Sequence, residues 1–129
     1  MRVLLDTHVL LWWRQDSSSL QKATRDLFAG DDNELLWSAA STWELGIKSR
    51  LGKLRLDEPF GPFITRILAE ENLRALPIHH AHVVHASELP LLHRDPFDRL
   101  LVAQAIVEQV PLLTNDRQLA AYGLVCISA

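Results

Sequence analysis

The segment Arg2–Arg14, RVLLDTHVLLWWR, places a single acid between two apolar stretches. Arg2–Leu5 is a short apolar run, which is typical of a strand that is buried in a parallel sheet. Asp6 ends this run, and Thr7–Arg14 reads as a short helix. The segment therefore predicts a buried strand that ends at an acid and leads directly into a helix.

The same alternation of strand and helix continues along the chain. Further strands are expected at Glu34–Trp37, Leu73–Ile78, Pro111–Thr114 and Leu124–Ile127. Further helices are expected at Leu20–Ala29, Ala39–Leu51, Phe63–Asn72, His80–Leu89, Pro96–Gln109 and Arg117–Tyr122. Short apolar strands that alternate with helices indicate an α/β domain with a mainly parallel sheet, here of about five strands.

The composition limits the class of protein. With 129 residues, of which 48% are hydrophobic, the chain can bury a core as one domain over residues 1–129. No apolar run reaches the ~18 residues of a membrane span, and Asp6 interrupts the apolar N-terminus, which argues against a signal peptide. Cys126 is the only cysteine, so no internal disulfide can form, which fits a cytoplasmic protein. Without a long apolar run, we also expect no membrane partner. The net charge of -3 provides no overall basic surface for nucleic acid, although a bound cation would change the local charge.

Acidic residues recur where the predicted strands end. Asp6 ends the first strand, Asp116 lies two residues past the fourth, Glu44 lies in the helix after the second, and Asp98 opens the longest helix. In parallel α/β sheets, ligands bind beyond the carboxyl ends of the strands. Clustered carboxylates repel one another unless a cation is present, and hard oxygen ligands favour Mg²⁺ or Mn²⁺. Because such ions act on phosphates, the residues alone indicate hydrolysis of phosphodiester bonds.

Each acid also has a purely structural interpretation as a helix cap. Asp6 and Asp116 could cap the helices that follow them, and Ser41–Glu44 matches the capping box S-x-x-E. In His93–Arg99, HRDPFDR, Asp95 suits the N-cap and Asp98 falls in the first turn, where an acid favours the helix dipole. Asp6 and Glu44, however, are flanked by apolar residues, and a cap does not require such a partly buried setting.

Four segments carry a resemblance to a known family. They are Leu4–His8, Ser38–Lys48, His93–Arg99 and Thr114–Asp116. Together they resemble the PIN-domain ribonucleases, most closely the VapC-type toxins of bacterial toxin–antitoxin pairs. The segments occur in family order over essentially the whole chain, and HRDPFDR followed by TND is the specific part. The resemblance implies a three-layer α/β/α sandwich, a Mg²⁺- or Mn²⁺-dependent endoribonuclease, a cognate antitoxin and a homodimer.

The resemblance also implies roles for individual residues. The catalytic and metal-binding acids would be Asp6, Glu44, Asp98 and Asp116. Asp6 and Asp98 would be the main ligands, with Thr7, Thr114 and Asn115 orienting ligands or water. Asp95 is kept as the helix cap.

Basic residues near the acids are candidates for RNA binding. Lys48, Arg50, Lys53 and Arg55 form a run that is either a solvated face or a contact for the RNA backbone. We place Lys48 and Arg50 among the substrate-binding residues, together with Arg94 and Arg99. The two latter arginines could instead pair with neighbouring acids, and His93 could contact phosphate or support the acids.

Histidines and tryptophans outside these segments have structural interpretations. His79, His80, His82 and His85 are treated as surface residues, because no acid or cysteine completes a zinc site. Trp37 and Trp43 are predicted to lie in the core. Trp12 and Trp13 are expected to face the core on one side and a dimer or antitoxin surface on the other.

Three alternatives remain beside an RNA-cleaving toxin. One is a PIN-fold nuclease that acts on DNA or in RNA processing. Another is a phosphoacceptor signalling domain, which would need paired acids after the first strand and a lysine after the last. It is disfavoured because Asp6 has no neighbouring acid and no lysine follows the last strand. The third is a binding module whose acids serve only as caps.

Overall fold

The computed structural model describes all 129 residues. The strands are β1 Arg2–Leu5, β2 Glu34–Ser38, β3 Leu73–Leu76, β4 Leu112–Thr114 and β5 Cys126–Ser128. The helices are α1 Thr7–Arg14, α2 Lys22–Ala29, α3 Ala39–Arg50, α4 Phe60–Glu70, α5 His80–Glu88 and α6 Pro96–Glu108, with the 3₁₀ helix η1 at Arg117–Tyr122. None of the helices combines the length and the apolar character that crossing a membrane requires.

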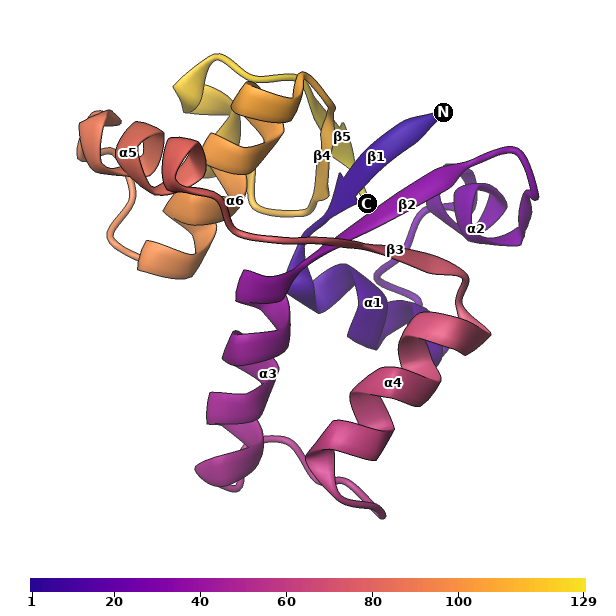
Figure 1. Cartoon of the computed structure of the whole chain (residues 1–129). Helices are drawn as coiled ribbons and strands as arrows, with labels where there is room; N and C mark the ends of the chain where they lie inside the picture. The colour runs from indigo at the N-terminus through magenta and orange to yellow at the C-terminus, as the bar shows by residue number, and fades with distance from the viewer.

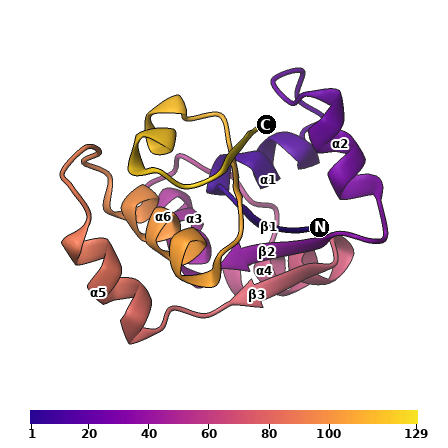
Figure 2. The same cartoon turned by 90° about the horizontal axis from the view of Figure 1, so that it is seen from above.

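All five strands form one parallel sheet in the order β3-β2-β1-β4-β5. Helices α5 and α6 lie on one side of the sheet, and α1 and α4 lie on the other (Figures 1 and 2). The predicted three-layer α/β/α sandwich with about five mainly parallel strands is confirmed.

Alternating side chains of the strands fill two separate cores. Val3 and Leu5 pack with residues of α1, α3 and α4, whereas Leu4 packs with residues of α6. This alternation follows from the two-residue period of a strand, and burial on both faces explains the continuous apolar run. The central strand β1 is buried from Val3 to Leu5, so its end is a fixed point from which Asp6 projects.

Several predicted boundaries differ from the observed ones. Helix α4 begins at Phe60 instead of Phe63, because Pro62 falls in the first turn, where a missing N–H costs no helical hydrogen bond. Helix α2 begins at Lys22, since the N–H of Leu20 is used in a turn with Ser17. The last strand runs to Ser128, which pairs with Thr114 of β4.

The capping-box interpretation of Ser41–Glu44 is wrong. The cap of α3 is Ser38, whose hydroxyl accepts the N–H of Ala40 at 3.0 Å, so Glu44 lies inside the helix. The prediction that Trp43 lies in the core is also wrong, because 66% of its surface is exposed. The buried face of α3 is formed by Ala40, Ser41, Glu44 and Leu45, and Trp43 falls outside this stripe. Trp37 is buried as predicted.

Candidate metal centre

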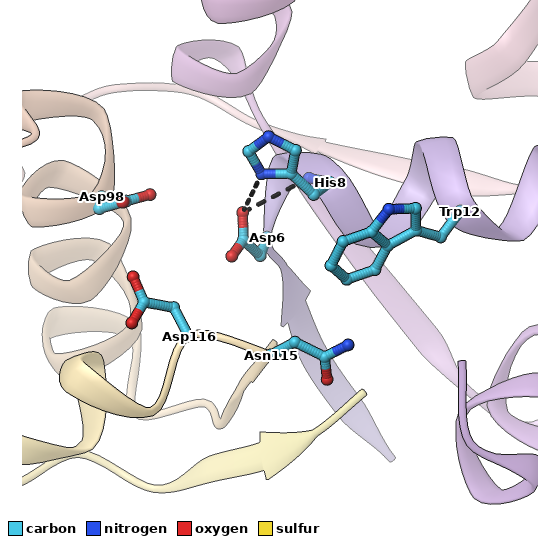
Figure 3. A pocket seen from close by; sticks show the side chains of 6 residues that line it. All are labelled: Asp6, His8, Trp12, Asp98, Asn115 and Asp116. Atoms are coloured by element: carbon cyan, nitrogen blue, oxygen red, sulfur yellow. Dashed lines mark hydrogen bonds and ion pairs between the residues drawn. The ribbon is translucent and has the colours of Figure 1, made fainter. Parts of the chain in front are cut away.

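A cavity of about 310 Å³ opens at the carboxyl ends of β1 and β4. Its walls are formed by Asp6, His8, Trp12, Asp98, Asn115 and Asp116 (Figure 3). Asp6 and Asp116 meet there because β4 lies next to β1, although the two acids are 110 positions apart in the sequence. Asp98 reaches the cavity from the first turn of α6. Three of the four acids predicted from the sequence therefore line one cavity.

Asp6 caps a helix and also faces the cavity. Its Oδ1 accepts the backbone N–H of His8 at 3.4 Å, and its Oδ2 accepts the hydroxyl of Thr114 at 2.6 Å. Burial raises the pKa of Asp6, but the hydrogen bonds from His8 and Thr114 outweigh it and hold the pKa below its usual value. Asp6 is therefore a carboxylate at neutral pH, so the capping role does not exclude metal binding.

His93 joins two of the acids. Its Nε2 lies 3.0 Å from Oδ2 of Asp116 and 3.5 Å from Oδ2 of Asp98. Its Nδ1 accepts the backbone N–H of Asp95 at 3.1 Å, so the proton of the neutral ring is on Nε2 and is donated to Asp116. Although the donor atoms of His93, Asp98 and Asp116 lie within 4.8 Å of one another, this hydrogen bonding makes His93 a donor to the carboxylates and not a metal ligand.

Glu44, the fourth predicted acid, is not part of the cavity wall, and one of its carboxylate oxygens makes no hydrogen bond. Its Oε2 is 3.4 Å from Nζ of Lys48, which also contacts Nε2 of His8 at 3.0 Å. Its Oε1 is buried and has no hydrogen-bond partner. A buried carboxylate oxygen without a partner is costly, so its presence beside other acids fits a site that accepts a cation.

The pKa of Asp98 reports the crowding of negative charge. Burial, with the charges of Asp6, Asp95 and Glu44, raises this pKa to about 7, although His93 lowers it. A divalent cation would reduce the repulsion among the acids and would give the unpartnered oxygen of Glu44 a partner. The donors are carboxylate oxygens, so the residues present fit a hard divalent cation.

The metal-free protein should lose stability as the pH rises from about 4 to about 7. In this range the folded state keeps the proton of Asp98, whose pKa rises from 3.8 to about 7, whereas the unfolded chain has lost it. Above about pH 6.5, the usual pKa of histidine, His8 acts in the same direction, because its hydrogen bond to Asp6 raises its pKa. Melting temperatures in EDTA should therefore fall across this range, and added Mg²⁺ should restore stability most at the upper end. A flat or rising melting temperature in EDTA would contradict the crowded cluster.

The residues expected to orient ligands lie in different settings. Thr114 holds Asp6 and also accepts the N–H of Asp116 at 3.0 Å, so it connects two of the acids. Asn115 lines the cavity. Thr7 donates its hydroxyl to Ser41 at 2.8 Å and thereby links α1 to α3, and it is not part of the cavity wall.

The four predicted RNA-binding residues lie in different places, and only one of them lies beside an acid of the site. Lys48 lies beside Glu44, whereas Arg50 and Arg94 are exposed and are not part of the cavity wall. Arg99 donates four hydrogen bonds from its terminal nitrogens, to the carbonyls of Ala86, Leu89 and Pro90 and to the hydroxyl of Tyr122. These contacts give Arg99 a structural role, and it pairs with no acid, so that alternative is wrong. Its role in substrate binding stays a prediction.

The expectation that the histidines of α5 lie at the surface is wrong for His82. This side chain is 1% exposed, and its Nε2 lies 3.0 Å from the carboxylate of Glu108. Its Nδ1 accepts the N–H of His79. Because α5 packs on α6, an acid that is distant in sequence supplies the partner.

Two residues of the cavity wall were not singled out as site residues from the sequence. His8 and Trp12 are four residues apart on α1, so they share one helix face. Their positions in the helix that follows Asp6 are the sequence signal that could have identified them.

Comparison with known proteins agrees with this geometry. The family model for the PIN domain matches residues 3–124. Ribonuclease VapC22 of Mycobacterium tuberculosis is 31% identical over 121 residues, which cover 93% of this chain and 91% of that protein.

Solved structures share the fold. The structure of VapBC2 from Rickettsia felis, bound to a DNA fragment from its promoter, matches with a TM-score of 0.73 at 18% identity, covering 98% of each chain. The structure of VapBC-1 from nontypeable Haemophilus influenzae matches with a TM-score of 0.67 at 18% identity, covering 99% of this chain and 98% of that one. The family match, the VapC relative and the arrangement of acids at the strand ends agree, and the chain belongs to the PIN-domain family.

Proposed function

We propose that the chain is a Mg²⁺- or Mn²⁺-dependent endoribonuclease and the toxin of a toxin–antitoxin pair. The observation that carries the proposal is the meeting of Asp6, Asp98 and Asp116 in one cavity, together with the unpartnered oxygen of Glu44, whose charge acts on Asp98. The relative with 31% identity is named a ribonuclease, which supports RNA as the substrate.

The acids would hold the cation, and neighbouring residues would fix the acids. Asp6 and Asp98 are the main proposed ligands, and Asp116 and Glu44 complete the set directly or through water. When bound, the cation supplies Lewis acidity at the phosphate and lowers the pKa of water to give the nucleophile. Thr114 holds Asp6, and His93 donates to Asp116, so both carboxylates keep their orientation without the cation.

Proposed partners follow from the relatives and from the surface. Two of the matching structures are VapBC complexes, which supports a cognate antitoxin for this chain as well. Large apolar side chains are exposed at Trp43, Val83, Val84, Leu91 and Leu92. Exposed apolar groups of this kind suit a protein surface, and we assign them to a homodimer or to the antitoxin.

Cleavage of a mixed RNA pool by antitoxin-free protein tests the proposal. Cutting should require Mg²⁺ or Mn²⁺, should stop in EDTA, and should fall by at least about a hundredfold in Asp6→Asn, which removes a proposed ligand. A DNA pool of matched length should remain intact.

The opposite results would be informative. Equal cutting by the wild type and Asp6→Asn would point to a contaminating nuclease. Cutting of DNA alone would favour the alternative of a DNA-directed nuclease. If a calorimetric titration detected no metal binding, the acids would have only the structural role of helix caps.

A further inference from the structure

Trp12 stands across the cavity from Asp98 and Asp116, with Asp6 between them (Figure 3). It is the only hydrophobic residue in the cavity wall. Helix α1 begins immediately after Asp6, so the backbone fixes the indole close to the acids. The cavity therefore combines an acidic side with one large aromatic surface.

Packing accounts for two other tryptophans better than for Trp12. Trp13 stacks on Phe28 with ring centroids 4.7 Å apart and donates its indole N–H to Glu71. Trp37 is buried and donates to Thr42. Trp12 is only partly buried, and its indole N–H has no partner within the chain. Its contribution to the core thus leaves part of the ring free to meet a ligand.

The ring of His8 lies next to the indole of Trp12, but the two rings cannot hold a base between them. The two ring centroids are 6.0 Å apart, and the planes are tilted by 35°. A base between two rings needs roughly twice a stacking distance of at least about 3.5 Å, so it would not fit between His8 and Trp12. A flat ligand would therefore stack on the part of the indole that faces the cavity.

The charges of the cavity favour such a contact. Its wall contains three acids and neither lysine nor arginine, and the nearby Lys48 is engaged by Glu44 and His8. Inside this cavity His8 is the one basic side chain, so attraction of the RNA backbone depends mainly on a bound cation. An aromatic face provides affinity that does not depend on charge, and every nucleobase can stack on it.

We propose that Trp12 is the platform of a nucleobase subsite, on which a base next to the scissile phosphodiester bond stacks. This inference rests on the proposed ribonuclease function and adds the group that positions the substrate. It predicts affinity for an unstacked base with little preference for its identity.

The test uses an RNA fragment that the wild type cuts, resynthesised with an abasic residue on either side of the cut bond. In the wild type, one of the two abasic positions should lower kcat/KM by about five- to hundred-fold. Trp12→Leu should show the same loss on intact RNA and little further loss on that abasic RNA, because both changes remove one contact. Trp12→Phe should retain most of the activity, because it keeps an aromatic face at this position.

A second measurement does not depend on the stability of a variant. RNA with 2-aminopurine at the same position is bound to the wild type, with Ca²⁺ replacing Mg²⁺ to slow cleavage, and its fluorescence should be quenched. Unchanged fluorescence at both flanking positions, or additive losses in the cleavage experiment, would overturn the subsite. A wild type that cuts no RNA would instead count against the proposed function, and this is seen before any Trp12 comparison.

Discussion

Replacing Asp98 by asparagine should lower metal-dependent RNA cleavage by at least about a hundredfold and also stabilise the metal-free protein. The loss of activity follows from the removal of a proposed ligand. The gain in stability follows from the raised pKa of about 7, because at higher pH the wild type carries a charge that burial and the neighbouring acids oppose. We expect a gain of about 1–2 kcal/mol at pH 8, after the loss of a favourable helix-dipole interaction.

Cleavage rates and melting curves in EDTA, measured on the same preparations, check this prediction. Asp95→Asn is the matched control, because asparagine retains the capping of Phe97 and the residue is outside the cavity wall. This control should keep most of the activity. A clear drop in melting temperature for Asp98→Asn in EDTA would indicate that the acid serves only the helix terminus.

Replacing Arg99 by alanine should destabilise the protein by about 2–4 kcal/mol. The guanidinium bonds to the carbonyls of Ala86, Leu89 and Pro90, at and just after the end of α5, and to Tyr122. Lysine cannot reproduce this planar set of donors, so Arg99→Lys should recover only part of the loss. Chemical denaturation monitored by circular dichroism measures the difference.

Arg94→Ala provides the comparison, because Arg94 is exposed and belongs to the same segment. It should change the free energy of unfolding by less than about 0.5 kcal/mol. Unchanged stability of Arg99→Ala, combined with weaker RNA binding, would restore the substrate-binding role that the sequence suggested.

The fold was largely predictable because strand and helix have different hydrophobic periods. The continuous apolar run of Arg2–Leu5 indicated burial on both faces, and the two cores on either side of β1 explain it. Trp43 shows the limit of this reasoning. Its hydrophobic character suggested the core, but its exposure depends on which face of α3 meets the sheet.

The candidate site was predictable only in part. The acids could be placed because the carboxyl ends of parallel strands share one edge. The role of Arg99 could not, because its partners are backbone carbonyls, which every residue possesses and which leave no mark on the sequence. His82 likewise depends on Glu108, a partner that only the packing of α5 on α6 supplies.

The central place of β1 also sets the time at which the protein can become active during synthesis. The ribosome makes β1 before the other strands, but one of its two neighbours in the sheet, β4, begins only at Leu112. Until residues 112–116 emerge, Asp6 lacks both its backbone bond to Leu113 and the hydroxyl of Thr114. A chain that has not reached β4 therefore has an open strand edge at β1 and lacks Asp116 from its site. A growing copy of the protein would therefore lack the complete cluster of acids until β4 and Asp116 have been made.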